Sequence, residues 1–485
     1  MTKEIFINHM HFETRLALVE DGVLQQIHID RNDAPSLVGN IYKAKVLRVM
    51  PGMQSAFVDI GSERNAFIPI DNISRAKVDD KIADVLRDGQ EILVQVVKDP
   101  VNKKGALLTT DLSIATDYLV YRHGRSKPGI SAKIRQKQER SRLNELMDSI
   151  ISSLELPESL RGNFIVRSAA DGISANQLTA DIHCFIDIWQ SIESLKLQKS
   201  PVVVYQESHR FQRLISAMVA QGINRLTVDC AEFLKQVNQW CNLESRAPKI
   251  HAELITAEGN LFDSYQLEQQ INAALNIEVA LDCGGYLVIE QTEALSVIDV
   301  NTGSYIGGNA DENTFYKVNL EAAIESARQI RLRNLSGIII IDFIDMQNGD
   351  HQRKVLKELK NEFLDDPSIG KISDFTEFGL VQIARKRTSR SLSQILCAPF
   401  KNSEARGVNK SEETLSLEII RELIKIKSNC AWKSIEICAS STIIAILQNK
   451  YSTQLNDFKS RTHCDVKLSL DRAIKSNQYN IIPTR

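Results

Sequence analysis

Residues 337–342 read GIIIID, a run of β-branched residues that begins with a glycine and ends with an aspartate. Such a run is typical of a buried β-strand. Upstream, residues 314–333 repeat apolar side chains at helical spacing, and a short apolar run at 295–298 precedes Asp299. The pattern predicts strand, helix and strand in that order, which is the unit that joins neighbouring parallel strands of a sheet.

Two aspartates end these predicted strands, Asp299 the first and Asp342 the second. Because the carboxyl ends of neighbouring parallel strands meet at one edge, we expect the two carboxylates to converge in one crevice. Asn301 lies two residues past Asp299 and would face the same side of an extended chain. Two carboxylates and an amide oxygen form an oxygen-only ligand set that suits Mg²⁺ or Mn²⁺ and does not suit zinc.

The simpler interpretation is that each aspartate forms a turn or caps a helix, which is the commoner role at the end of a strand. The metal interpretation gains weight from the pair, because two like charges close together are unfavourable without a cation. A bound Mg²⁺ could activate water and stabilise the charge on a phosphodiester. Asp345 competes with Asp342 for this role, and spacing alone does not choose between them.

The segment 37–110 has a different pattern. It contains five short strand candidates, at 38–49, 55–60, 65–69, 91–97 and 105–110. Five short strands in a segment of this length suit a small closed barrel of the OB kind. Phe57 and Phe67 lie on adjacent candidates and Lys104 precedes the last one, so they could stack bases and hold phosphates on such a barrel. Both phenylalanines could equally belong to the core, which is the commoner place for a strand phenylalanine. The nearby Lys43 favours RNA modestly.

Length, charge and cysteine usage limit the class of protein. The 485 residues suggest about three domains, and a net charge of -2 excludes a globally basic nucleic-acid binder but not a locally basic groove. The basic run at 384–390 could contact a nucleic-acid backbone or form a solvated helix face. No apolar stretch approaches a membrane span, residues 1–10 lack a signal-peptide core, and the eight cysteines show no paired spacing, so we expect a cytoplasmic protein without a membrane.

The order of motifs along the chain resembles the ribonuclease E/G family of bacterial endoribonucleases nearly end to end. The length is that of the short members of the family, without a long scaffold tail. The matching stretches are AFVDIG at 56–61, KGA at 104–106, LLTTD at 107–111, QES at 206–208, TEAL at 292–295, IDVN at 298–301, NLEAA at 319–323, IDFIDM at 341–346, FGLV at 378–381 and RKRT at 385–388. So many ordered matches are more specific than any single motif.

The resemblance implies a multidomain α/β fold. Its parts would be an RNase H-like part that is split by an S1-type OB barrel and a 5′-sensor, a DNase I-like catalytic domain, a linker and a small C-terminal α/β domain that dimerises. In this sequence the segments would be 1–36 (RNase H-like, first part), 37–110 (S1-type OB), 111–211 (5′-sensor), 212–276 (RNase H-like, second part), 277–396 (DNase I-like), 397–410 (linker) and 411–485 (dimerisation).

The resemblance also implies roles for particular residues. Asp299 and Asp342 would hold Mg²⁺, in preference to Asp345, and Asn301 would hold Asp299 or the scissile phosphate. RNA would lie on the surface of Phe57, Phe67 and Lys104. A 5′-monophosphate would bind at Arg167 and Ser168, with the chain near Thr116 and Val120 completing the pocket, and an arginine beside a hydroxyl suits a phosphate on physical grounds as well.

Three departures from the family pattern stand out. Ser168 replaces a threonine but keeps its hydroxyl, and the sensor region near Ala132 lacks an arginine, although Lys133 adjoins it. The family links two chains through a zinc ion held by Cys-Pro-x-Cys pairs, whereas here Phe400 and Ser403 occupy the thiolate positions beside Cys397. A lone thiolate per chain cannot supply a four-sulfur site, so we predict no zinc and a homodimer that rests on packing alone.

The function that follows is a Mg²⁺-dependent endoribonuclease that cuts single-stranded, A/U-rich RNA, favours 5′-monophosphorylated ends and leaves 5′-phosphate and 3′-hydroxyl products. The resemblance implies work on 16S ribosomal RNA precursors and messenger RNA. One alternative is a non-catalytic RNA-binding protein in which the acids are structural. Another is a metal-dependent DNA nuclease, because a DNase-like layout does not choose the sugar.

Overall fold

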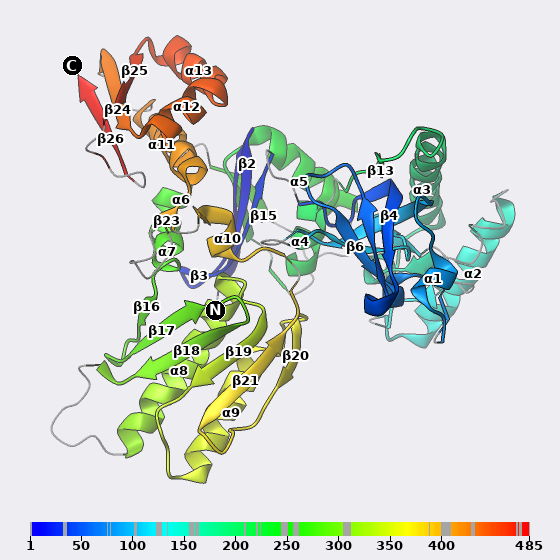
Figure 1. Cartoon of the computed structure of the whole chain (residues 1–485), viewed down its shortest axis with the longest axis horizontal. Helices are drawn as coiled ribbons and strands as arrows, with labels where there is room; N and C mark the ends of the chain where they lie inside the picture. Colours follow the sequence, from blue (N-terminus) through cyan, green and yellow to red (C-terminus); the bar gives the residue numbers. More distant parts are fainter. Residues whose placement is uncertain are drawn as a thin grey trace. The chain divides into compact units, whose positions relative to one another are not determined.

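The computed structural model divides the chain into two compact units (Figure 1), each of which carries more than one sheet. Unit 1 comprises Met1–Asn32, Arg225–Ala231 and Glu253–Arg485, and unit 2 comprises Asp33–Asn224 and Glu232–Ala252, so most of unit 2 is inserted into unit 1. The structure describes residues 2–484 except 33–35, 75, 78, 101–103, 123–128, 133, 155–159, 161–163, 208–209, 220–221, 224, 244–250, 256–260, 304–311, 388, 399–408, 428–431, 472–473 and 475–477.

The barrel of unit 2 confirms the expected five strands. They are β4 (Ile41–Met50), β5 (Ser55–Asp59), β6 (Ala66–Pro69), β7 (Glu91–Lys98) and β8 (Leu107–Thr109). Their order is β4-β5-β6-β8-β7, and β4 also pairs with β7, which closes the barrel. Alternate residues such as Val58 and Ile68 fill its core, as the period of two in a strand requires. A further strand, β13 (Val202–Tyr205), pairs with β4.

Another part of unit 2 packs two long helices on a small sheet. The sheet has the order β11 (Gly129–Ile130), β12 (Phe164–Val166), β10 (Leu119–Arg122) and β9 (Ser113–Ala115). The helices are α2 (Lys137–Ser153) and α3 (Ala175–Leu195), and Ser174 with Gln177 forms a capping box that starts α3. Tyr121 stacks on Phe185 of α3 with 4.5 Å between ring centroids, so aromatic packing joins sheet and helix.

Unit 1 begins with a five-stranded sheet. Its order is β15 (His251–Leu254), β14 (Arg225–Val228), β1 (Lys3–Met10), β2 (Glu13–Glu20) and β3 (Val23–Arg31). The first strand is antiparallel to β2 and parallel to β14, so it is central although it begins the chain. Phe6 of β1 packs in one core with Phe262 of α6 (Leu261–Ser264) and Leu267 of α7 (Leu267–Ala273).

The second sheet of unit 1 contains the predicted strand, helix and strand. Its order is β16 (Glu278–Ala280), β17 (Tyr286–Gln291), β18 (Leu295–Asn301), β19 (Gly337–Asp342), β21 (Leu380–Arg385) and β20 (Ile369–Ile372). Helix α8 (Glu312–Leu332) lies between β18 and β19 in sequence and, with α9 (Gly349–Glu362), covers one face of the sheet, as Figure 1 shows. The other face is more open than the run of isoleucines suggested, because Ile338 of β19 is 54% exposed.

The C-terminal part of unit 1 is a small α/β domain. It contains α11 (Glu412–Lys427), β24 (Ser434–Ala439), α12 (Ser441–Asn449), α13 (Ser452–Thr462), β25 (Asp465–Leu470) and β26 (Tyr479–Thr484). Before it come α10 (Leu392–Leu396), which packs in the core of the first sheet, and the paired strands β22 (Cys397–Ala398) and β23 (Asn409–Lys410). Strand β24 is central, parallel to β25 and antiparallel to β26. Among the helices of the described residues, none has the length and apolar character to cross a membrane.

Candidate functional site

The two aspartates occupy neighbouring positions at the end of the parallel strands β18 and β19. Asp299 is the register partner of Asp342, and both are exposed on the sheet face opposite the helices. Residues that pair across a ladder point to the same face, so the two carboxylates share one surface. Asp345 lies three residues beyond the end of β19, outside the ladder. The strands thus bring together the pair that their sequence pattern predicted.

Asn301 is joined to this pair by a hydrogen bond. Its Nδ2 donates to Oδ2 of Asp299 at 2.9 Å, which fixes one oxygen of that carboxylate. The backbone beside Asn301 is closely packed, because a Cβ on Gly285 would come within 2.8 Å of the Asn301 carbonyl oxygen. A side chain at Gly303, which has a φ of +57°, would meet the carbonyl oxygen of Gly284 at 2.4 Å. Glycine at these two positions therefore allows the close packing of the backbone at the end of β18.

Helix α8 holds the loops on either side of the pair through two polar side chains. Asn319 is fully buried and clamps Ile344, donating to its carbonyl oxygen at 2.7 Å and accepting from its N–H at 3.0 Å. Glu321 accepts hydrogen bonds from the backbone N–H groups of Asp282 and Cys283 in the turn before β17. Both residues belong to the NLEAA stretch at 319–323, so the motif positions the backbone that surrounds the acids.

The electrostatics of the pair are unfavourable without a cation. Partial burial raises the pKa of Asp342 above its ordinary value, and the charges of Asp299 and Asp345 raise it further. In the described part of the chain no lysine or arginine forms an ion pair with Asp299 or Asp342. Nor do those residues contain a cluster of three or more His, Cys, Asp or Glu side chains that would form a protein-only metal cage. Mg²⁺ suits such a sparse site, because it keeps several waters and needs only one or two carboxylates.

The barrel presents its two candidate aromatics together. Phe57 of β5 is the register partner of Phe67 of β6, with 6.3 Å between ring centroids, and both side chains are half-buried on the face opposite the barrel core. Lys104 is exposed, and the next residue, Gly105, approaches Asn65 so closely that a Cβ would lie 1.9 Å from its carbonyl oxygen. These features favour the surface interpretation of the two phenylalanines over the core interpretation.

Lys43 does not strengthen this barrel surface. Its Nζ forms an ion pair with Glu91 at 2.8 Å and donates to the Gln198 carbonyl oxygen at 2.9 Å. None of the described residues of the basic run at 384–390 lies in a helix, and its contact with a nucleic-acid backbone stays a prediction, in which Arg385 would take no part. Arg385 ends a strand rather than lying on a helix, and its buried guanidinium pairs with Asp366 at 2.9 Å. Neither cation is therefore directed toward solvent.

The predicted 5′-phosphate residues lie around one turn of unit 2. The Nη1 of Arg167 donates to the carbonyl oxygens of Thr116 at 2.6 Å and Asp117 at 3.0 Å. The hydroxyl of Thr116 donates to Asp181 at 2.7 Å, so part of this site is already occupied by internal bonds. Ser168 is exposed at the start of a short 3₁₀ turn, and Val120 pairs with Ile165 on the neighbouring strand.

The linker is only partly within the described residues. Cys397 is half-buried in β22, and burial raises the pKa of its thiol to about 11, so the thiol is protonated at neutral pH. Phe400, Ser403 and Lys133 lie outside the described residues. The expected absence of a zinc link remains a prediction.

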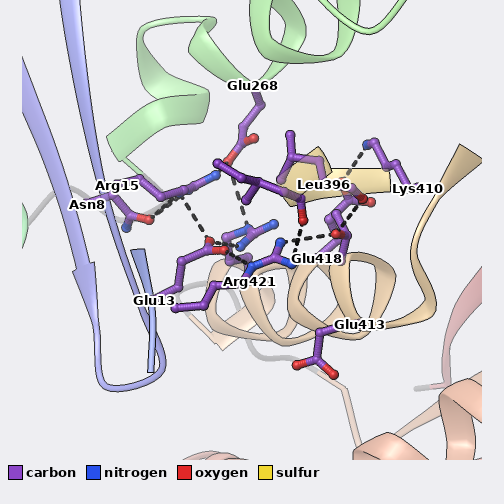
Figure 2. Close-up of polar contacts among 12 residues, drawn as sticks. Asn8, Glu13, Arg15, Glu268, Leu396, Lys410, Glu413, Glu418 and Arg421 are labelled. Atoms are coloured by element: carbon purple, nitrogen blue, oxygen red, sulfur yellow. Dashed lines mark hydrogen bonds and ion pairs between the residues drawn. The ribbon is translucent and has the colours of Figure 1, made fainter. Parts of the chain in front are cut away.

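Sequence reasoning missed a buried ion-pair network in unit 1 (Figure 2). Glu13 of β2 lies between Arg31 at 2.8 Å, Arg15 at 3.6 Å and Arg421 of α11 at 2.8 Å. Arg15 also pairs with Glu268 at 2.7 Å. Figure 2 shows these two side chains beside each other. Glu13 and Arg421 are 408 positions apart, and no local signal in the sequence connects them. The network attaches the C-terminal domain to the first sheet.

Comparison with known proteins shows the family to which the chain is related. A sequence model of the Ribonuclease E/G family matches residues 113–388, and one of the S1 RNA binding domain matches residues 37–110. Ribonuclease G of Haemophilus influenzae is 37% identical over 495 aligned residues, which cover 99% of both chains. Ribonuclease G of Salmonella typhimurium is 35% identical over 99% of this chain and 100% of its own. Ribonuclease E of Escherichia coli is 35% identical over 93% of this chain but only 43% of its own length.

The chain belongs to the ribonuclease E/G family of endoribonucleases, which are hydrolases and are generally metal-dependent. Within the family it is similar to ribonuclease G over its whole length, as the motifs indicated. The five-stranded barrel coincides with the S1 match, so the predicted S1-type OB domain is confirmed and supports RNA binding.

Proposed function

We propose that this chain is a Mg²⁺-dependent endoribonuclease that cuts single-stranded, A/U-rich RNA, with Mn²⁺ as a possible substitute. The observation that carries this proposal is the register of Asp299 against Asp342 at the end of two parallel strands. The two acids lie side by side on one face of the sheet, without a paired cation among the described residues, and their oxygen-only ligand set fits a hard divalent metal. The relatives named ribonuclease G supply the kind of reaction.

In this proposal each residue has a stated task. Asp299 and Asp342 hold the metal, and Asn301 orients Asp299 through its amide N–H. When bound, Mg²⁺ would orient water and offset the negative charge of the phosphodiester under attack. Cleavage would leave 5′-phosphate and 3′-hydroxyl ends. Asp345 is not assigned to the metal, because it lies beyond the ladder that aligns the other two acids.

The proposal extends to the parts of the chain that contact RNA. Phe57, Phe67 and Lys104 form the RNA surface of the S1 domain, and Arg167 with Ser168 binds a 5′-monophosphate near Thr116. The sheet with order β16-β17-β18-β19-β21-β20 is the DNase I-like catalytic part, and the sheet with order β15-β14-β1-β2-β3 is the RNase H-like part. The substrates would be 16S ribosomal RNA precursors and messenger RNA in the cytoplasm, processed by a homodimer without zinc.

The test compares three substrates. Purified full-length protein is incubated with 5′-monophosphorylated RNA, 5′-hydroxyl RNA of the same sequence and single-stranded DNA, each with and without Mg²⁺. We expect cleavage of RNA only, only with Mg²⁺, and faster for the 5′-monophosphate. Asp299→Asn should abolish cleavage and leave RNA binding measurable. Full activity of this variant would reject the assignment, cleavage of DNA would favour a DNA nuclease, and binding without cleavage by the wild type would favour a non-catalytic protein.

A further inference from the structure

A hollow of about 320 Å³ lies between the segment that follows β19 and the turn that precedes β21. Its walls include Phe343, Asp345, Phe375, Glu377 and Phe378. The volume is at the lower end of the range for small-molecule sites, which leaves room for one planar ring system. Aromatic side chains together with carboxylates make a lining that can hold a polar, flat ligand.

The hollow lies at the same end of the strands as the acid pair, on the side of α9, and Asp345 in its wall is close enough to Asp342 to raise the pKa of that carboxyl. Asp342 is the register partner of Leu380, the first residue of β21, and Phe378 lies two residues before Leu380. On the other side Asp345 follows Asp342 by three residues, a length of chain that spans at most about 10 Å. A phosphodiester held at the acid pair would therefore place a neighbouring nucleotide next to the hollow.

The turn that forms one wall is well defined. The N–H of Gly379 donates to the Thr376 carbonyl oxygen at 3.0 Å, and the N–H of Leu380 donates to the Thr376 hydroxyl at 3.1 Å. Gly379 has a φ of +77°, which favours glycine, and a Cβ there would be in ordinary contact with Oδ1 of Asp345 at 3.4 Å, so the turn lies beside that carboxylate. The turn carries Phe378, which is 84% exposed.

The opposite wall is rigid. Phe343 is almost fully buried, and its ring packs against that of Phe375 with 5.6 Å between centroids. Gln352 of α9 is fixed by a hydrogen bond to the Met346 carbonyl oxygen at 2.8 Å. An exposed phenylalanine on a defined turn, opposite two packed rings, is a suitable platform for a base.

The two carboxylates determine which base fits. Ionised carboxylates only accept hydrogen bonds, so they require an N–H donor from the ligand. Adenine, cytosine and guanine offer an exocyclic amino group with two N–H donors, one for each carboxylate. Uracil offers only its N3–H, which lies between two carbonyl oxygens that the negative charges would repel. Asp345 and Glu377 form no hydrogen bond or ion pair with other described residues, so their acceptor capacity is available for such a donor.

We infer that this hollow binds one base of the RNA substrate, next to the scissile phosphate, with Phe378 stacked on the base and Asp345 and Glu377 accepting from its amino group. The inference rests on the proposed function, because it needs a phosphodiester at Asp299 and Asp342. In A/U-rich RNA the base selected by this chemistry is adenine. The hollow therefore contributes to the choice of cleavage site.

The first experiment is a double-mutant cycle that combines a protein variant with an altered RNA substrate. Single-stranded RNA with one cleavage site is prepared in versions that each replace one nucleotide beside the scissile phosphate by an abasic nucleotide. We expect one position at which the abasic change lowers kcat/KM about tenfold for the wild type, the magnitude typical of losing a stacked base. Phe378→Ala should lower kcat/KM by a similar factor on intact RNA, mainly through KM, and should not respond to the abasic change.

The matched control is Leu364→Ala, because Leu364 is 80% exposed, follows α9 in the same domain and does not line the hollow. This variant should behave as the wild type on every substrate. If the effects of Phe378→Ala and of the abasic nucleotide simply multiply, or if no position responds, the base site is rejected. Asp299→Asn is assayed in parallel: if it remains active the proposed function fails, and if it is inactive the rejection concerns the base site alone.

The second experiment tests the amino group. Adenosine at the responsive position is replaced by purine riboside, which lacks only the exocyclic amino group. We expect the wild type to lose about tenfold in kcat/KM, the magnitude of a charge-assisted hydrogen bond. Glu377→Ala should lose most of this discrimination while retaining the response to an abasic nucleotide. Equal cleavage of the adenosine and purine riboside substrates by the wild type would overturn the role given to the carboxylates.

Discussion

Glu13 and Asp342 are both acids of unit 1, but the protein treats their charges in opposite ways. Glu13 is buried and touches three arginines. Burial alone would raise its pKa, yet the guanidinium groups of Arg421, Arg15 and Arg31 outweigh burial and lower it. Partial burial raises the pKa of Asp342, and the neighbouring carboxylates of Asp299 and Asp345 raise it further. An acid whose charge is balanced by cations stabilises the fold, whereas an unbalanced pair of acids at a strand end is a candidate functional site.

The largest expected difference between the roles of the two acids is in the variant Asp342→Asn. We expect cleavage to fall by about 10³-fold or more, because the proposed site loses one of the two carboxylates that would hold the metal. The thermal midpoint should stay the same or rise, since a like-charge repulsion is removed. The control is Asp374→Asn, an exposed acid of the same domain that pairs with Lys360. Strong cleavage by Asp342→Asn would show that Asp342 is not needed for the reaction, and the contrast with Glu13 would then be wrong.

The reverse experiment is Glu13→Gln. We expect the free energy of unfolding of unit 1 to fall by about 3–5 kcal/mol, because three buried guanidinium groups lose their shared anion. Calorimetry of the full chain measures the shift, and cleavage by the fraction that remains folded should be unchanged. Glu20→Gln on the same strand is the control, since its pair with Lys3 is exposed and worth at most about 1 kcal/mol. Equal changes in the free energy of unfolding for Glu13→Gln and Glu20→Gln would contradict the stabilising role given to the buried ion pairs of Glu13.

Asn301→Ala should have an intermediate effect. Loss of the 2.9 Å hydrogen bond frees Asp299, and removing such a supporting contact typically weakens metal affinity by 10–100-fold. The measurement is the Mg²⁺ concentration that gives half-maximal cleavage, which should rise while the rate at saturating Mg²⁺ changes less. An unchanged Mg²⁺ dependence would mean that Asn301 does not orient Asp299.

The smallest expected effect concerns pH. The ionised form of Glu13 stabilises the folded chain above pH 4.5, its ordinary pKa, and this contribution is lost as the pH falls through its lowered folded-state pKa. The difference in thermal midpoint between the wild type and Glu13→Gln should therefore be constant near neutral pH and shrink below pH 4.5. A difference that grows on acidification would show that the arginines do not hold Glu13 ionised.

Local patterns predicted the parts of the fold whose partners are near in sequence. The barrel strands and the β18–α8–β19 unit follow from alternation, helical spacing and turn residues, and a parallel crossover then places Asp299 beside Asp342. Phe57 and Phe67 could be placed on adjacent strands, but not on the outer face, because that depends on which alternate residues close the barrel.

Long-range pairing could not be predicted. Glu13 finds Arg421 across 408 positions, and the sequence contains many other arginines that would satisfy it equally well. The same holds for Lys43, whose pairing with Glu91 appears only when the barrel closes, and for Arg385, which seemed to belong to a basic surface run. The hollow beside Phe378 is formed by two loops that no periodicity describes.

The place of β1 at the centre of its sheet has a consequence during synthesis. Ile7 pairs with Leu16 immediately, but its parallel neighbour Val228 leaves the ribosome 221 residues later, after most of the inserted unit. At 5–20 residues per second this is a delay of about 10–45 s. The nascent β1–β2–β3 meander must therefore wait with an unpaired edge while unit 2 folds, and a ribosome that stalls in this interval would expose that edge to aggregation.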